Sequence, residues 1–324
     1  MGMSLITGID IGRYSIKAVV VKPEKQHFTI VAFHELPVSD AVFSDNHTLN
    51  YQDSVKKLKD LKKMLPWMSH EAAMAIPDST VISKVLQIDA STDDAEQEFA
   101  IHQAFSYQSP FSIEELRLDY VAASTTGPSS TKAFQVFAAK REVIESRQRA
   151  AIKAGFKPRV MDTQAHALAR VYQQAAEKTH KSGWLLVDVG HVQTTLCLVG
   201  EAVVHKEFAF GTHSALSQEQ AVTGDDGFVR QLSERLRRQI QMLPMASGQS
   251  IQGIWLTGGG AYLAMIEEHL SNALGLPCEK LAPLSLASVK PKLCEQAMQG
   301  QHQYAVALGA ALGAYEWESQ HYAT

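Results

Sequence analysis

Residues that suit a phosphate group and its metal ion lie close together near the start of the chain. An apolar run ends at Asp10, and the polar turn after it carries Gly12, Ser15 and Lys17 before the chain becomes apolar again. Glycine lets backbone N–H groups approach phosphate oxygens, and a carboxylate holds Mg²⁺ directly or through water. Ordinary hairpins also carry Asp and Gly for turn geometry, so this turn alone leaves both interpretations open. The candidate cofactor-binding residues of this first turn are Asp10, Gly12, Arg13, Tyr14, Ser15 and Lys17.

The same pattern returns in the second half of the chain. An apolar run leads to Asp188 and Gly190, and a second apolar run follows at a constant offset from the first copy. This repeat of strand, Asp-x-Gly turn and strand indicates an internal duplication. Two such halves facing each other would hold a polyphosphate between their turns, with Asp10 and Asp188 as the metal ligands. The candidate cofactor-binding residues of the second turn are Asp188, Gly190, Gln193, Thr194 and Thr195.

Three consecutive glycines form a third candidate site. Gly258–Gly260 follow the apolar run Ile251–Leu256 and precede Tyr262 and a helix expected over Leu263–Leu274. A strand, a glycine turn and a helix N-terminus make an anion or nucleotide site through backbone geometry. A tight strand-to-helix turn would use the same glycines, and that alternative stays open. The candidate cofactor-binding residues here are Gly258, Gly259, Gly260 and Tyr262.

Strands and helices must hold these turns in place. Alternating and continuous apolar runs predict a three-strand meander over Leu5–Asp10, Ile16–Lys22 and Phe28–Leu36, and a matching third strand over Ala202–Phe210 in the second copy. Tyr51–Leu65 has helical periodicity, with lysines opposite its apolar face. An anionic partner would suit those lysines, but we favour a solvated helix face.

A separate unit is predicted between the two halves. From Thr80 to Val160 the pattern is β-α-β-β-α-β, with the last strand over Phe156–Val160. This insertion shows no catalytic grouping, and an interaction module is the natural interpretation.

Composition limits the class of protein. The 324 residues are about two domains' worth, and the net charge of −4 gives no general attraction to nucleic acid or anionic lipid. Cys197, Cys278 and Cys294 show no metal-ligand spacing, which is typical of a reducing compartment. No apolar run approaches the roughly 18 residues of a transmembrane helix, and the N-terminus has no signal-peptide pattern. We therefore expect a soluble cytoplasmic protein.

The order of the three turns resembles the actin-like ATPase superfamily. Asp10–Lys17 and Asp188–Thr195 resemble its two phosphate motifs, and Leu256–Tyr262 resembles its adenosine motif. Ala75–Ile82 and Asp162–Tyr172 are similar to the PilM family of bacterial type IV pilus assembly proteins, which has an FtsA-like inserted subdomain. The resemblance implies an α/β, two-lobed actin-like fold, a duplicated ribonuclease H-like unit. The implied divisions are a first lobe of residues 1–79, 161–182 and 303–318, an insertion of residues 80–160, and a second lobe of residues 183–302.

The resemblance also implies a function. It predicts a scaffold at the inner face of the inner membrane that binds ATP and Mg²⁺ between its lobes. The scaffold would also bind the cytoplasmic N-terminal tail of the membrane protein PilN, in a groove formed by the first lobe and the insertion. The membrane would be reached only through that partner, nucleic acid would not bind, and copies would associate into a ring. In the family an acidic helix contacts the nucleoside, whereas Gly211–Gly227 is short and lacks that signature. No residue stands out as a water-activating base, so no catalytic residue is assigned and we expect weak or no ATPase activity.

Two other functions share this fold. A small-molecule kinase would need a catalytic Asp in a recognisable loop, and the sequence shows none. A division protein like FtsA would need a C-terminal amphipathic membrane helix, and Glu316–Thr324 is too short and polar for one.

Overall fold

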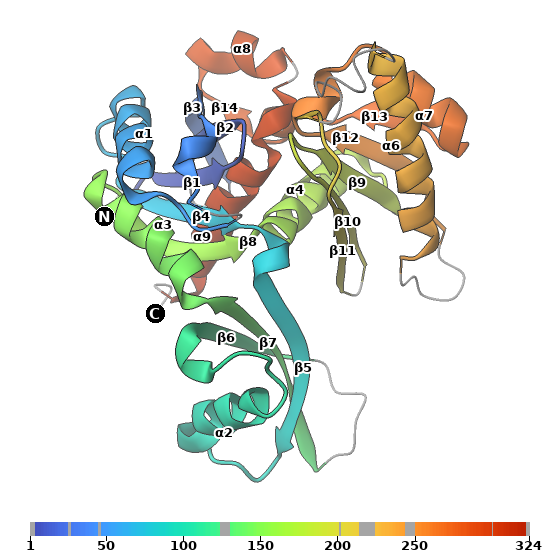
Figure 1. Ribbon diagram of the computed structural model, residues 1–324. Coiled ribbons are helices and arrows are strands. Elements are labelled where there is room, and N and C mark those ends of the chain that lie inside the picture. The colour runs from blue at the N-terminus through green and yellow to red at the C-terminus, as the bar shows by residue number, and fades with distance from the viewer. Residues whose placement is uncertain are drawn as a thin grey trace.

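The computed structural model describes residues 4–24, 27–44, 47–123, 130–200, 202–213, 224–243, 250–299 and 301–321. Their strands form three sheets: two in an upper body and a third in a unit that projects below it (Figure 1). Three segments for which the sequence predicted irregular structure lie wholly or partly outside the described residues. They are the hairpin tip at residues 124–130, the breaker at residues 244–249 and the connection at residues 211–227.

The first sheet contains the predicted meander. Its six strands run in the order β14-β3-β2-β1-β4-β8. The strands are β1 (Ile6–Ile11), β2 (Ser15–Pro23), β3 (Phe28–Pro37), β4 (Glu71–Ile76), β8 (Lys157–Thr163) and β14 (Ser288–Val289). β1, β2 and β3 pair antiparallel, whereas β4 and β8 continue the sheet parallel to β1. The three predicted meander strands are confirmed.

The second sheet repeats the first. Its order is β11-β10-β9-β12-β13, and its strands take the same relative directions as β3-β2-β1-β4-β8. The strands are β9 (Trp184–Val189), β10 (Thr194–Val199), β11 (Val203–Phe208), β12 (Gly253–Thr257) and β13 (Cys278–Lys280). Asp10 lies opposite Lys17 in the β1–β2 pair, and Asp188 lies opposite Thr195 in the β9–β10 pair. The predicted internal duplication is therefore confirmed at the level of single residues.

Two helices lie between the sheets and join them (Figure 1). They are α4 (Gln164–Thr179) and α9 (Ala305–His321), which pack against each other, while α9 also packs on β1 and α4 on β10. Thr163 caps α4 by accepting a hydrogen bond from the backbone N–H of His166. The first part of α9, up to Ala314, is buried and made mostly of alanine and glycine, so its backbone can approach both neighbours closely. One hydrophobic core therefore spans both lobes.

The insertion has a three-stranded sheet of its own. Its sheet has the order β5-β7-β6, and α2 packs on one face of that sheet through a core that includes Leu86, Ile101 and Phe105. The elements are β5 (Val81–Asp89), α2 (Asp94–Ser106), β6 (Leu116–Ala122) and β7 (Thr131–Lys140). The prediction that the strand after α3 belongs to the sheet of the insertion is wrong, because this strand, β8, pairs with β4 of the first sheet. Local sequence shows that a strand exists but not which distant strand it joins, and we propose that the insertion spans residues 80–140.

The helices before and after the insertion lie side by side (Figure 1). α1 (Tyr51–Met64) begins after Asn50, whose side chain accepts hydrogen bonds from the N–H groups of Gln52 and Asp53. α3 (Arg141–Lys153) packs against α1 and buries Ala150 and Ala151 in the core of the first lobe. We therefore propose that α3 belongs to the first lobe and not to the insertion.

Three further helices lie in the described part of the chain. They are α6 (Gly224–Gln241), α7 (Ile266–Leu274) and α8 (Cys294–Met298). Residues 224–227 were expected as a turn but form the first turn of α6. Short 3-10 turns are η1 (Asp40–Val42), η2 (Asp78–Thr80), η3 (Ile113–Glu115), η4 (Gly259–Tyr262), η5 (Pro283–Leu286), η6 (Pro291–Leu293) and η7 (His302–Tyr304).

Candidate nucleotide site

The two duplicated turns have the same backbone geometry. The N–H of Gly12 donates to the carbonyl of Ser15 at 3.0 Å, and the N–H of Gly190 donates to the carbonyl of Gln193 at 2.9 Å. A Cβ atom on Gly12 or Gly190 would lie 3.2 or 2.9 Å from that same carbonyl oxygen, so both turns have little room for a side chain. Each turn thus presents a compact loop of backbone at the end of a buried strand.

The two repeated aspartates lie close enough together for the charge of Asp10 to act on Asp188. Asp10 is buried, its Oδ2 lies 3.3 Å from the ammonium of Lys17, and its Oδ1 has no hydrogen-bond partner among the described residues. The pKa of Asp188 is raised to about 7, first by burial and then by the nearby charge of Asp10, against the opposing charge of Lys17. A buried carboxylate oxygen without a partner is costly. A Mg²⁺ ion bound by Asp10 and Asp188 would satisfy that oxygen and replace the proton of Asp188, so the residues fit the metal.

The glycine motif adjoins Asp188. Gly258 has a φ of 84°, and a Cβ there would lie 2.9 Å from Oδ1 of Asp188. A Cβ on Gly260 would lie 2.3 Å from the side chain of Val189. Packing against the end of β9 therefore explains two of the three glycines. Gly259 is exposed, and a Cβ there would have no atom within 4 Å. Packing therefore does not explain this glycine, which lies beside open space.

The helix expected from Leu263 begins later than predicted. Residues 259–262 form η4, Leu263 is extended, and α7 begins only at Ile266 after Met265 in a left-handed conformation. The motif therefore offers its backbone as a 3-10 turn and not as the N-terminus of a long helix. Sequence alone could not separate these because both use the same residues.

Hydrogen bonds link the first turn to the glycine motif. Ser15 donates to Glu35 of β3 at 2.5 Å, and Gln303 of η7 donates to the other oxygen of Glu35 at 3.0 Å. Tyr262 in turn donates to Gln303 at 2.5 Å. Sequence reasoning missed Glu35 and Gln303. The alternation of strand residues could have indicated Glu35, because it lies opposite Lys17 in the β2–β3 pair, whereas no pattern marks Gln303.

An aromatic contact connects the tips of the two turns. The ring of Tyr14 lies 5.3 Å from that of His191, and His191 lies 5.1 Å from His213. Tyr14 is 59% exposed, so this contact lies at the surface of the gap. The sequence did not predict that Tyr14 and His191 would meet, because their proximity depends on how the lobes are placed.

The four remaining candidates interact with protein groups or are buried. The guanidinium of Arg13 lies 4.4 Å from the centre of the Phe43 ring. The amide of Gln193 donates to Gln164 and Glu207, both at 3.1 Å, and the hydroxyl of Thr194 donates to a backbone carbonyl. Thr195 is buried in β10. These contacts shape the turns, and we expect the backbone and the two aspartates to be the groups that meet a ligand.

A buried acidic junction lies behind the second turn. Asp78 lies in η2, just before the insertion, and accepts a hydrogen bond from the N–H of Ala165, at the start of α4, at 2.9 Å. Burial raises the pKa of Asp78 to about 6. His205 of β11 lies 3.8 Å away, and burial together with Asp78 raises the pKa of Glu207. The insertion, the first lobe and the second lobe therefore meet at Asp78.

This junction predicts a pH dependence of stability. Because the pKa of Asp78 is about 6 in the folded state and 3.8 ordinarily, the folded protein holds a proton that the unfolded chain releases. The contribution is fully present below about pH 4 and is lost as the pH rises through about 6. Lowering the pH from about 7 to about 5 should raise the free energy of unfolding by about 1 kcal/mol more in the wild type than in Asp78→Asn.

Urea unfolding at the two pH values measures this difference. Asp119→Asn, at an exposed position of β6, is the matched control and should respond like the wild type. An equal pH response in Asp78→Asn and the wild type would show that Asp78 is not protonated in the folded protein.

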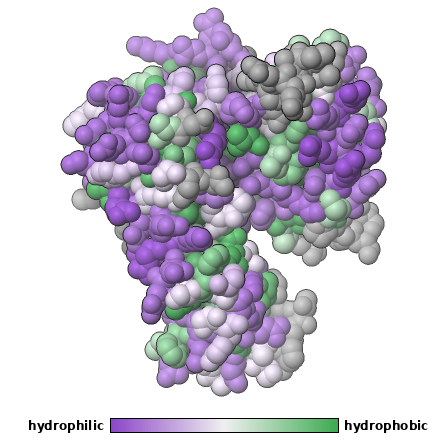
Figure 2. Space-filling model, viewed as in Figure 1, coloured by the Kyte–Doolittle hydropathy of each residue, from purple (hydrophilic) through white to green (hydrophobic). Residues whose placement is uncertain are grey.

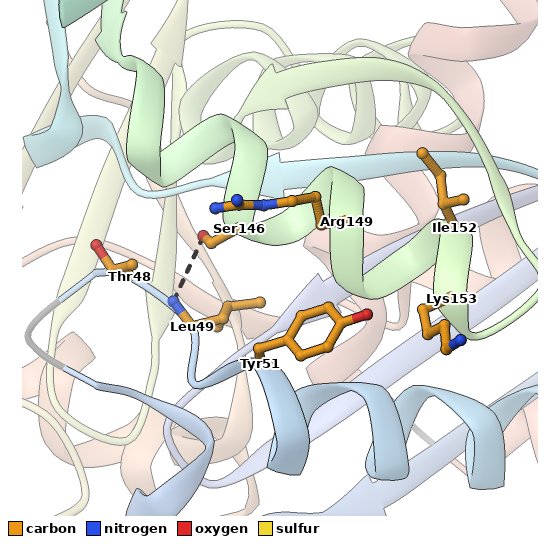
Figure 3. A pocket seen from close by; sticks show the side chains of 7 residues that line it. All are labelled: Thr48, Leu49, Tyr51, Ser146, Arg149, Ile152 and Lys153. Atoms are coloured by element: carbon orange, nitrogen blue, oxygen red, sulfur yellow. Dashed lines mark hydrogen bonds between the residues drawn. The ribbon is translucent and has the colours of Figure 1, made fainter.

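The two described cavities lie away from the aspartates. A groove of about 620 Å³ runs between α1 and α3 (Figure 3). A cavity of about 360 Å³ lies where the insertion joins the first lobe. Thr48 lines both, so they adjoin.

Comparison with protein families gives one match over almost the whole chain. The family model of the type IV pilus assembly protein PilM matches residues 8–223 and 225–315.

Solved structures show the same architecture. A chain of a PilM–PilN type IV pilus biogenesis complex is 21% identical, with a TM-score of 0.78 over 95% of this chain and 98% of that one. The ethanolamine utilization protein EutJ from Carboxydothermus hydrogenoformans is 14% identical, with a TM-score of 0.56 over 96% of this chain and 90% of its own. MreB5 of Spiroplasma citri bound to ADP is 11% identical, with a TM-score of 0.51 over 98% of each chain. These similarities show the two-lobed actin-like fold.

Proposed function

The chain belongs to the family of the type IV pilus assembly protein PilM, and from this we propose that it is an ATP-binding scaffold that grips the cytoplasmic N-terminal tail of an inner-membrane partner like PilN. The solved relative with the TM-score of 0.78 comes from a PilM–PilN complex, which supports the choice of partner. The family match does not favour the alternatives, a small-molecule kinase or an FtsA-like division protein.

We assign the partner's tail to the cavity between the insertion and the first lobe. Apolar side chains from both parts line it, including Ile82 of β5, Leu116 of β6 and Val143 of α3. Lys140 and Glu142 add one charge of each sign, and the ammonium of Lys140 lies 4.8 Å from the ring centre of Phe111. Figure 2 shows hydrophobic residues at the neck where the insertion meets the body. At about 360 Å³ the cavity is large enough for one or two apolar side chains of an extended peptide.

Calorimetry with a synthetic tail peptide of the partner tests this assignment. Phe111→Ala should weaken binding by about tenfold, because the ring is half-exposed and lines the cavity. Phe99→Ala is the matched control: the same ring is removed from α2, where it is 72% exposed and outside the cavity. Equal affinities of both variants would place the tail elsewhere, and no binding to the wild type would refute the scaffold.

The nucleotide part of the proposal depends on Asp10, Asp188 and Gly259. The carboxylates suit Mg²⁺, and the exposed backbone of Gly259 suits the nucleoside. The ADP of MreB5 supports a nucleotide in this fold. The short residues 211–227 still predict a weak adenosine side, and residues 214–223 lie outside the described part. We propose that ATP biases closure of the lobes and is hydrolysed slowly or not at all.

The same proposal places the protein at the inner face of the inner membrane. No described helix is long and apolar enough to cross a bilayer. Attachment would come through the membrane partner, and assembly of several copies into a ring would match a ring of partner tails.

A further inference from the structure

Exposed cations gather on the outer face of α1 and α3. The fourteen residues of α1 include five lysines and two aspartates. Lys56, Lys59 and Lys63 are exposed, and their spacing of three or four places them on one side of the helix. Arg149 and Lys153 are exposed on the neighbouring α3. We call these five residues the basic face; Figure 2 shows the surface over α1, at the upper left, as mostly hydrophilic.

The other two lysines of α1 point to protein groups. Lys57 donates to the carbonyl of Pro37 at 2.8 Å, and the ammonium of Lys62 lies 5.0 Å from the ring centre of Phe156. Asp60 pairs with Lys63 at 2.9 Å, and the pKa of Asp60 is lowered first by that hydrogen bond and then by the charges of Lys63, Lys56 and Lys57. The local field along this side of α1 is therefore positive, although the whole chain has a net charge of −4.

Apolar side chains lie next to these cations. Directly after α1, Trp67 is 80% exposed and Met68 is 60% exposed. Figure 3 shows Tyr51 of α1 and Ile152 of α3 about the groove between the two helices, together with Arg149 and Lys153. Tryptophan and tyrosine beside lysine and arginine are typical of surfaces that rest on the headgroup region of a bilayer.

We propose that the basic face and Trp67 bind the anionic surface of a membrane directly. The cations lie on two helices that pack against each other, and of the five only Arg149 and Lys153 line the groove between them, so the charges are spread over the surface and suit a charged plane better than an acidic peptide. Each Lys or Arg near an anionic leaflet adds a modest attraction, so five of them with one interfacial Trp give reversible, salt-sensitive binding. This goes beyond the proposed function, in which only the partner reaches the membrane.

The position of the face agrees with the proposed tail cavity. Thr48 lines both the groove between α1 and α3 and the cavity assigned to the partner's tail. A membrane-anchored tail would therefore enter beside the surface that contacts the lipid.

Vesicle flotation of the full chain without any partner tests the proposal. The protein should float with phosphatidylcholine vesicles that contain about one third phosphatidylglycerol, fail to float with pure phosphatidylcholine, and be released at high salt. The triple change Lys56→Glu, Lys59→Glu and Lys63→Glu should reduce binding at least about tenfold. The matched control variant carries Arg230→Glu, Arg238→Glu and Lys292→Glu, which change the net charge equally at exposed positions elsewhere. Its binding should stay within about twofold of that of the wild type.

Fluorescence adds a readout specific to Trp67. Trp184 and Trp255 are buried, and Trp317 is less than half as exposed as Trp67, so a blue shift on adding anionic vesicles should come mainly from Trp67 and vanish in Trp67→Phe. Equal binding to neutral vesicles, or equal loss in both triple variants, would overturn the proposal. Binding of polyglutamate or duplex DNA without vesicle binding would overturn it too, in favour of another anionic partner.

Discussion

Replacing Gly309 with alanine is expected to lower the free energy of unfolding by at least about 2 kcal/mol. A Cβ at this position of α9 would lie 1.9 Å from the carbonyl oxygen of Ala167 in α4. That oxygen belongs to the backbone of a buried helix, so it cannot rotate away as the end of a side chain could. Alanine favours a helix interior by about 1 kcal/mol over glycine, but the overlap with α4 outweighs this gain.

The same test applies on the other side of α9. A Cβ on Gly8 of β1 would lie 1.9 Å from the carbonyl of Ala307, so Gly8→Ala should also destabilise. Gly259→Ala is the control, because no atom lies within 4 Å of its Cβ, and its stability should change by less than about 0.5 kcal/mol. Chemical unfolding of the three variants measures the differences. If Gly309→Ala were as stable as the wild type, the close approach of α4 and α9 would be wrong.

This packing also concerns function, because α4 and α9 join the lobes. α9 packs on β1, which carries Asp10 next to its last residue, and α4 packs on β10, which begins at Thr194 in the second turn. A shift of one helix against the other would move the two aspartates relative to each other. We therefore expect the position of the first turn to depend on Gly8 and Gly309 as well as on its own residues.

The sequence predicted the turns because their geometry is local. Asp10, Gly12 and the strands on either side are consecutive, and the second copy repeats them. The duplication and the equivalence of Asp10 and Asp188 could therefore be predicted without a structure. The family resemblance added the fold, which the family match and the structural neighbours confirm. The roles of the individual site residues stay predictions.

The errors and omissions share a different cause, since each depends on contacts between distant segments. β8 was placed in the insertion because it follows α3, but its partner is β4. Gln303 reaches Glu35 from the other end of the chain. The lysines of α1 were interpreted as a solvated helix face, and the periodicity of α1 could not show that α3, which carries Arg149 and Lys153, packs against this helix.

The largest functional effect is expected from Asp10→Asn. The amide keeps the shape of the carboxylate but removes the charge that a magnesium ion needs. Affinity for ADP in the presence of Mg²⁺ should fall on the order of 100-fold, or about 2.7 kcal/mol, while affinity measured with a chelator should change little. Loss of the negative charge of Asp10 should also lower the pKa of Asp188, because that charge contributes to raising it. Asp188 would then stay ionised to a lower pH in the variant than in the wild type, where its pKa is about 7, so the loss should be smaller at low pH than at high pH.

Titration calorimetry with and without Mg²⁺ measures both parts of this prediction. Asp119→Asn, an exposed aspartate of the insertion, controls for the chemical change and should bind like the wild type. Gly259→Val tests the other end of the site: its side chain would enter the open space beside the backbone, so ADP should be lost with and without the metal. The two variants therefore separate the metal from the nucleoside. If both kept wild-type affinity for ADP, the nucleotide would bind outside the gap between the repeated turns, and Asp10 and Gly12 would be turn residues alone.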